Sequence, residues 1–186
     1  MVKKIKKIEK LATRINENKE VHLVLSDAQK LADVTSDLLS ALIKQQKLRC
    51  LYISLNKEYK VMHTLIEKKG INQSKIYFID GISKAAGESA SPVNFTFISG
   101  LNSLTELSIT ITIALNTNNF DFLFFDSLDA LLVYHDLETI ERFSRYIIGK
   151  LNVSNIGGVI LSSKLKGKER RLITILSSSC DNCISL

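Results

Sequence analysis

Residues 120–128 read FDFLFFDSL, and this stretch decides the fold. Apart from Asp121, its first six residues are apolar, which is typical of a central strand covered on both faces. Asp126 and Ser127 follow at the carboxyl end of this predicted strand. Ligands of open α/β sheets bind at such carboxyl ends, so the pair is a candidate site. The structural alternative is that Asp126 hydrogen-bonds the backbone of the next turn.

Further apolar runs on both sides of this stretch predict more buried strands. They cover residues 21–25, 48–55, 75–80, 93–98, 158–161 and 172–176. Helical periodicity fills most segments between them, as in residues 137–151. Continuous apolar strands that alternate with helices predict a three-layer α/β/α fold with a mostly parallel central sheet. Residues 81–92 are small and polar, which indicates a surface loop.

One segment, residues 104–115, carries two conflicting signals. Its LSITITIAL core alternates apolar and hydroxyl-bearing residues, many of them β-branched, which favours a strand. Ser103 and Glu106, however, have the spacing of a capping box at the start of a helix. Leu107 and Ile111 would then share one helical face. We predict a helix here.

The chain of 186 residues is long enough for one domain with a substantial core. No apolar run approaches the roughly 18 residues of a membrane helix. No apolar segment follows the N-terminal lysines, as a secretory signal would require. We expect a cytoplasmic protein with a basic amphipathic helix over residues 1–18, an α/β domain over 19–179 and a tail over 180–186. Ile8 and Ile15 have the spacing to pack that helix on the domain.

The net charge of +6 is concentrated in two segments. Residues 1–20 carry seven basic and three acidic groups, and residues 164–171 carry five and one, so each segment is +4. The basic groups of the second segment are Lys164, Lys166, Lys168, Arg170 and Arg171. Such patches attract acidic proteins or nucleic acid, although a solvated basic surface is the commoner meaning. We predict partner or polyanion contact at these residues.

The cysteines and histidines predict no complete metal or catalytic site. Cys180 and Cys183 form one C-x-x-C pair, which supplies only half of the ligands of a zinc site. Two chains would have to contribute one pair each to complete such a site. His22 lies in a predicted strand, where a core histidine with satisfied hydrogen bonds is expected. Ser127 and His135 are the nearest nucleophile and base, but no G-x-S-x-G motif surrounds the serine.

The ordered strands and the Asp126-Ser127 strand end together resemble the KaiC-like branch of the RecA-type ATPases. In that family an apolar strand of this kind ends in Asp-Ser, and its aspartate holds Mg²⁺ through water. The resemblance covers roughly residues 20–178 and implies a RecA-like (P-loop NTPase-like) core. It makes Asp126 and Ser127 a Walker B remnant.

The same resemblance exposes a missing phosphate-binding loop. A P-loop reads G-x-x-x-x-G-K-[ST], because glycines let the backbone N–H groups approach the phosphates. Residues 26–33 read SDAQKLAD and contain no glycine. Ser26 and Gln29 have instead the spacing of a capping box, and Asp27 adds a negative charge where a triphosphate would sit.

Two further catalytic features of the family are absent by the same comparison. The family's glutamate pair falls on Asn56 and Lys57, with Glu58 one residue late; Asn56 instead can cap the next helix. The Lys-x-Arg finger of its last strand finds no match, because the predicted strand 172–176 runs into serines. We therefore expect no P-loop ATP hydrolysis, and we disfavour ATP·Mg²⁺ as a cofactor.

Three functions are compatible with this sequence. The first is a non-catalytic KaiC/RecA-like domain, a pseudo-ATPase that serves as a protein-interaction or signalling module through self-association or a protein partner. The alternative is a nucleotide or nucleic-acid binder that keeps a ligand at the strand carboxyl ends. The third is an enzyme of another class that uses Asp126.

Overall fold

The computed structural model describes residues 2–82, 94–117 and 119–186. Its described strands form one parallel sheet in the order β4-β3-β2-β5-β6-β1-β7. Their bounds are β1 Val21–Ser26, β2 Cys50–Ser54, β3 Ile76–Asp80, β4 Phe95–Phe97, β5 Phe122–Asp126, β6 Gly157–Ser163 and β7 Asn182–Ser185. The mostly parallel sheet predicted from the apolar runs is confirmed.

Strand β5 lies inside the sheet, between β2 and β6, and all five of its residues are buried. The register aligns Ser54 with both Asp80 and Asp126, so three polar strand ends share one row. This row lies at the carboxyl edge of the sheet. The central strand predicted from FDFLFF is therefore confirmed.

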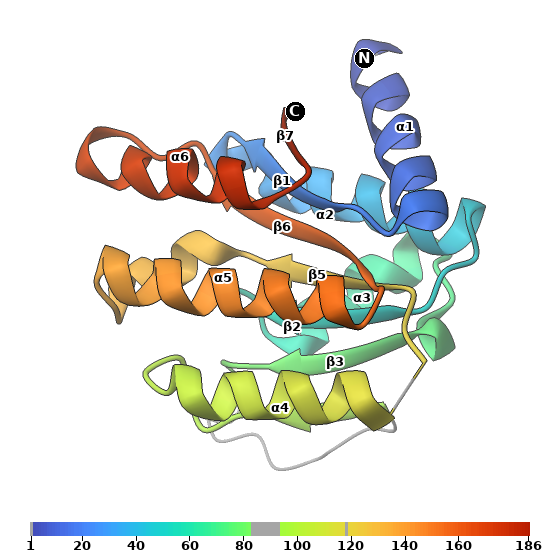
Figure 1. The fold of residues 1–186 in the computed structure, drawn as a ribbon. Coiled ribbons are helices and arrows are strands. Elements are labelled where there is room, and N and C mark those ends of the chain that lie inside the picture. Colours follow the sequence, from blue (N-terminus) through green and yellow to red (C-terminus); the bar gives the residue numbers. More distant parts are fainter. Residues whose placement is uncertain (1, 83–93, 118) are drawn as a thin grey trace.

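Helices cover both faces of the sheet (Figure 1). One face carries α1 (Val2–Asn18), α2 (Leu31–Leu39) and α3 (Tyr59–Lys68), and the other carries α4 (Leu104–Thr117), α5 (Leu137–Val153) and α6 (Arg170–Ser179). A π-helix, Ser40–Gln45, continues α2. Each face has its own apolar cluster, which gives the three-layer α/β/α architecture.

Helix α4 resolves the ambiguous segment in favour of a helix. The Ser103 Oγ accepts a hydrogen bond of 3.2 Å from the Glu106 N–H, which is one half of the predicted capping box. The Glu106 carboxylate accepts instead from the Ser99 N–H at 3.0 Å. The hydroxyls of Ser108 and Thr112 donate to carbonyls four residues earlier, at 2.7 and 2.8 Å. Because these hydroxyls are satisfied within the helix, their alternation with apolar residues does not require a strand.

The strand predicted over residues 172–176 is wrong, because this segment lies in α6. Leu172 and Leu176 are buried against the core, and Thr174 between them is exposed, as one face of a helix requires. The sequence LITIL fits both the two-residue repeat of a strand and the 3.6-residue repeat of a helix, and the packing of Leu172 and Leu176 selects the helix. No strand ends at Ser177, so the family's Lys-x-Arg finger cannot be sought there.

The terminal segments both pack on the sheet. Residues 182–185, within the expected tail, form β7, which pairs in parallel with β1. In α1 the predicted apolar stripe is buried from Ile8 to Ile15, whereas Ile5 is about half exposed at 48%. Most of the predicted loop 81–92 falls on residues 83–93, outside the described residues. No helix in the described ranges has the length and apolarity needed to cross a membrane.

Candidate functional site

Asp126 is completely buried where β5 ends, and four side chains donate hydrogen bonds to its carboxylate. Oδ2 accepts from the Tyr52 hydroxyl at 2.5 Å, Thr35 Oγ1 at 3.1 Å and Lys57 Nζ at 3.2 Å. Oδ1 accepts from Asn56 Nδ2 at 3.4 Å. We call these five residues the Asp126 network.

The donors come from three different elements around the strand end. Thr35 lies in α2, Tyr52 lies on β2, and Asn56 and Lys57 lie in the loop between β2 and α3. That loop is held in place because the Ser54 hydroxyl donates to the Lys57 carbonyl at 2.5 Å. The side chains of the loop thus point back to the sheet edge.

The predicted capping of α3 by Asn56 is wrong. The helix begins at Tyr59, and the Tyr59 N–H donates to Asp80 Oδ2 at 2.9 Å. Asn56 Nδ2 instead donates to Ser127 Oγ at 2.9 Å and to Asp126. Asn56 therefore connects the two residues predicted as a Walker B remnant. The peptide bond that joins them is cis.

The electrostatics of the network depend on one cation. Lys57 is 19% exposed and is the charged partner of the fully buried Asp126 carboxylate. Burial, followed by the charge of Asp126 and the hydrogen bond to it, raises the pKa of Tyr52 well above its ordinary value. Tyr52 therefore stays protonated and donates at neutral pH. A buried charge that keeps both an ion pair and hydrogen bonds avoids most of its desolvation cost.

The carboxyl end of β1 is built differently. Ser26 ends this strand, and its Oγ is buried without a hydrogen-bond partner among the described residues. The predicted capping box with Gln29 is therefore wrong. A short 3₁₀ turn, Ala28–Lys30, leads into α2 instead.

Asp27 covers this strand end with two ion pairs. Its carboxylate lies 3.0 Å from Lys30 Nζ and 3.0 Å from Lys164 Nζ. Hydrogen bonds from Lys164 and then Lys30 lower the pKa of Asp27. Lys164, predicted as a polyanion contact, is thus paired within the chain across the ends of β1 and β6.

The residues at these strand ends do not fit a magnesium–triphosphate. A phosphate needs free backbone N–H groups in a glycine-rich turn, and residues 26–33 contain no glycine. Asp27 brings a negative charge to the same turn. Asp126, which a metal would use, already accepts from four protein donors, one of them the Lys57 cation.

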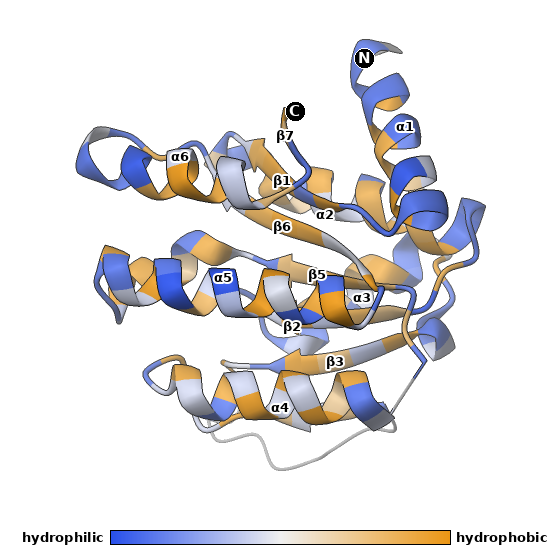
Figure 2. Cartoon of the chain, viewed as in Figure 1, coloured by the Kyte–Doolittle hydropathy of each residue, from blue (hydrophilic) through white to orange (hydrophobic). Residues whose placement is uncertain are grey.

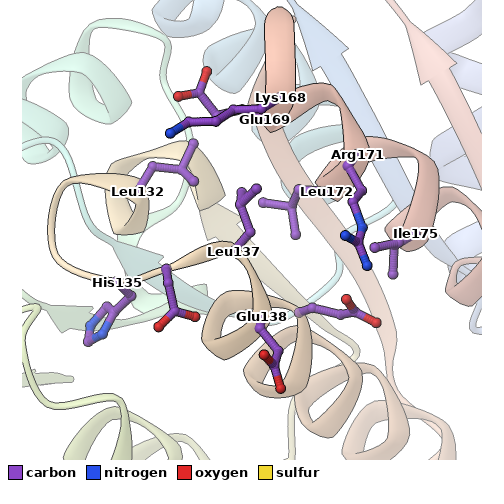
Figure 3. Close-up of a pocket in the computed structure, with 11 residues that line it drawn as sticks. Leu132, His135, Leu137, Glu138, Lys168, Glu169, Arg171, Leu172 and Ile175 are labelled. Carbon is purple, nitrogen blue, oxygen red and sulfur yellow. The ribbon is translucent and has the colours of Figure 1, made fainter.

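The rest of the predicted basic contact segment lies beside a pocket of about 540 Å³ between α5 and α6 (Figure 3). Lys168 and Arg171 line it, Arg170 begins α6, and Lys166 is exposed just before the short 3₁₀ turn Gly167–Glu169. The same pocket is lined by four acidic residues: Asp136, Glu138, Glu141 and Glu169. Its charge is therefore mixed.

The other candidate side chains are not brought together. The His135 ring is bonded through Nε2 to the Leu101 carbonyl at 2.6 Å, and Ser127 is bonded by Asn56. His22 is buried as predicted, but the expected satisfied hydrogen bonds are not found, because neither ring nitrogen has a hydrogen-bond partner in the part of the chain that is described. Burial lowers the pKa of His22, although the Glu20 carboxylate lies 3.1 Å from its Nε2.

The C-x-x-C pair lies where α6 meets β7. Cys180 follows α6 and is half-buried, and Cys183 is exposed on β7. Burial raises the pKa of the Cys180 thiol to about 12. Among the described residues no group of three or more His, Cys, Asp or Glu could hold a metal ion.

Sequence reasoning missed Tyr52, Thr35 and Lys57 as partners of Asp126. Tyr52 left a signal, because a hydroxyl in the apolar run LRCLYISL must find a partner once it is buried. Thr35 and Lys57 left none, since either residue is ordinary where it stands.

Comparison with known proteins identifies the fold. No protein-family model matches the sequence, and no curated protein sequence is significantly similar to it. Among solved structures, the KaiC-like protein PH0186 from Pyrococcus horikoshii OT3 matches with a TM-score of 0.64 and 10% identity, over 90% of this chain and 71% of that one. At this identity the likeness shows the fold alone. The chain has a KaiC-like, RecA-type α/β fold.

Proposed function

We propose that this chain is a non-hydrolysing KaiC-like domain that acts as a protein-interaction or signalling module. One observation carries the proposal: the Asp126 carboxylate is held by four donors of its own chain. In this arrangement the aspartate supports the fold and is not available to a ligand.

A metal ion would have to compete with this network. To bind Mg²⁺, Asp126 would have to release the Tyr52 hydroxyl and Lys57, both largely buried. The Lys57 ammonium, 3.2 Å from Oδ2, would repel the incoming cation. Mg²⁺ would replace Lys57 as the counter-charge of Asp126, but its binding would have to offset the loss of this ion pair and of the hydrogen bonds that Asp126 already accepts.

The phosphate side of the site supports the same proposal. The turn after β1 has no glycine, and its Asp27 is the carboxylate that Lys30 and Lys164 neutralise. Those two lysines are therefore engaged with the protein. A triphosphate would meet a carboxylate where a P-loop offers N–H groups.

The alternative, a nucleotide or nucleic-acid binder, is favoured by Lys168 and Arg171 in the pocket between α5 and α6. The four acidic side chains of that pocket count against it, since they repel phosphates at short range. A protein partner that carries both charges fits the lining better.

Thermal unfolding of the full chain with and without millimolar ATP·Mg²⁺, at matched salt, tests the proposal. A ligand present at 100 times its Kd adds about 2.7 kcal/mol to the stability of the native state. We expect no change in the midpoint and no phosphate release in a parallel hydrolysis assay. A raised midpoint that Asp126→Asn abolishes would contradict the proposal and assign the site to nucleotide.

A further inference from the structure

The outer edge of the sheet at β7 is bordered by the most basic helix of the chain. Strand β7 pairs with β1 and with no other described strand, so it is an edge strand. Figure 1 shows α1 beside this edge. An edge strand leaves about half of its N–H and C=O groups without a ladder partner, which makes it a template for another strand.

A groove runs between α1 and β7. It has a volume of about 290 Å³ and is lined by residues 182–185 of β7 and by Lys7, Lys10, Leu11 and Arg14 of α1. The contacts show that α1 runs antiparallel to β7. Lys7 Nζ donates to the Ser185 carbonyl at 2.9 Å, and Arg14 Nη1 donates to Asn182 Oδ1 at 3.2 Å. The groove thus follows the whole strand.

The charges in this groove are of one sign. Its lining includes three basic side chains and no acidic one. Arg14 is paired with Glu20 at 2.8 Å, but Lys7 and Lys10 form no ion pair within the described ranges of the chain. Figure 2 shows the same helix as predominantly hydrophilic outside its buried stripe. An acidic ligand would therefore complete this surface.

We propose that the α1–β7 groove binds an acidic peptide segment in an extended conformation, which adds to β7 as a further strand. Backbone hydrogen bonds to β7 would hold the peptide, and Lys7 and Lys10 would select carboxylates along it. Lys7 already donates to the Ser185 carbonyl of β7. A carboxylate of the peptide would attract the Lys7 ammonium away from this carbonyl, which would then be free to accept a backbone hydrogen bond from the peptide. The proposal rests on the proposed function as an interaction module.

Two other occupants fit this surface less well. A second copy that paired β7 with β7 would bring the lysines of two α1 helices together. Nucleic acid would be attracted by the charge but has no strand backbone to continue the ladder. A peptide uses both the charge and the unpaired edge.

The test measures binding of a short capped peptide that alternates glutamate and valine to the full-length, isotope-labelled chain. The groove variant is Lys7→Glu with Lys10→Glu. The matched control is Lys3→Glu with Lys6→Glu, which makes the same charge change on exposed positions of the same helix outside the groove lining. Amide exchange in residues 182–185 reports strand addition, and a lysine–valine peptide and a short thymidine oligonucleotide are the competing probes.

We expect the groove variant to weaken binding at least about tenfold, the control less than about twofold, and the β7 amides to gain protection on binding. Equal weakening by both variants, or binding without protection, would overturn the proposal in favour of diffuse charge attraction. Tighter binding of the oligonucleotide, or a dimer lost in the groove variant, would assign the surface to nucleic acid or to a second copy. The ATP·Mg²⁺ experiment is independent of these lysines, so failure here leaves the proposed function standing.

Discussion

In the sheet, β5 and β1 are separated only by β6, yet the buried polar groups at their carboxyl ends differ in hydrogen bonding. At β5 the Asp126 carboxylate accepts from four side chains. At β1 the Ser26 hydroxyl is equally buried and has no partner in the described structure. A charge cannot be buried without partners, whereas a hydroxyl can at modest cost. The first end should therefore be essential to stability and the second dispensable.

The sharpest way to break this contrast is Asp126→Ala. Removing the acceptor leaves the Lys57 ammonium and the Tyr52 hydroxyl without their buried partner, so we expect a loss of about 3–5 kcal/mol in the free energy of unfolding. Urea denaturation followed by circular dichroism measures it. Asp129→Ala is the matched control, because Asp129 accepts one 3.3 Å bond from Ser163 N and should cost under about 1 kcal/mol. Equal losses in the two variants would show that the network carries no special stability.

Lys57→Met removes the cation and keeps the carboxylate. We expect a loss of about 2–3 kcal/mol, below the full cost of a broken buried pair because Lys57 is partly exposed and the neutral donors remain. In the double variant with Asp126→Asn, the two losses should not add, since the charge that Lys57 compensates is gone. Additive losses in this denaturation cycle would mean that the two side chains act independently.

Tyr52→Phe removes one hydroxyl and keeps the ring. The ring packs against Phe78 and Phe124 at centroid distances of 5.3 and 5.4 Å, and these contacts survive the substitution. We expect a loss of about 1.5–2 kcal/mol, because the missing hydrogen bond goes to a charged acceptor. A neutral result in the same urea titration would show that Asp126 does not need this donor.

Ser26→Ala should have the smallest effect. The hydroxyl has no partner to lose, so the change in the free energy of unfolding should lie within about 0.5 kcal/mol, or be slightly stabilising. Ser54→Ala is the matched control, because this buried serine donates to the Lys57 carbonyl and its removal should cost about 1 kcal/mol. A larger loss in the free energy of unfolding for Ser26→Ala than for Ser54→Ala would contradict the absence of a partner for the Ser26 hydroxyl.

Local pattern predicted most of the sheet, because β1, β2, β3, β5 and β6 lie in largely apolar runs. It missed β7, because Asn182–Ser185 reads NCIS and is not an apolar run. It failed at α6, where Leu172 and Leu176 fit either period and only their packing selects the helix. Asp126 was found from its strand end. Its donors Thr35 and Lys57 stand 91 and 69 residues away in sequence, so only the tertiary fold could assign them.

The position of β1 between β6 and β7 has a consequence for synthesis. Val21 pairs with Gly158 and His22 with Asn182, so β1 emerges long before either of its sheet neighbours. At about 5–20 residues per second, this apolar strand waits on the order of ten seconds for its partners. Such non-local pairing also slows folding itself. We therefore expect chaperones to bind β1 of the nascent chain. The chain should become resistant to proteases only after β6 and β7 have paired with β1.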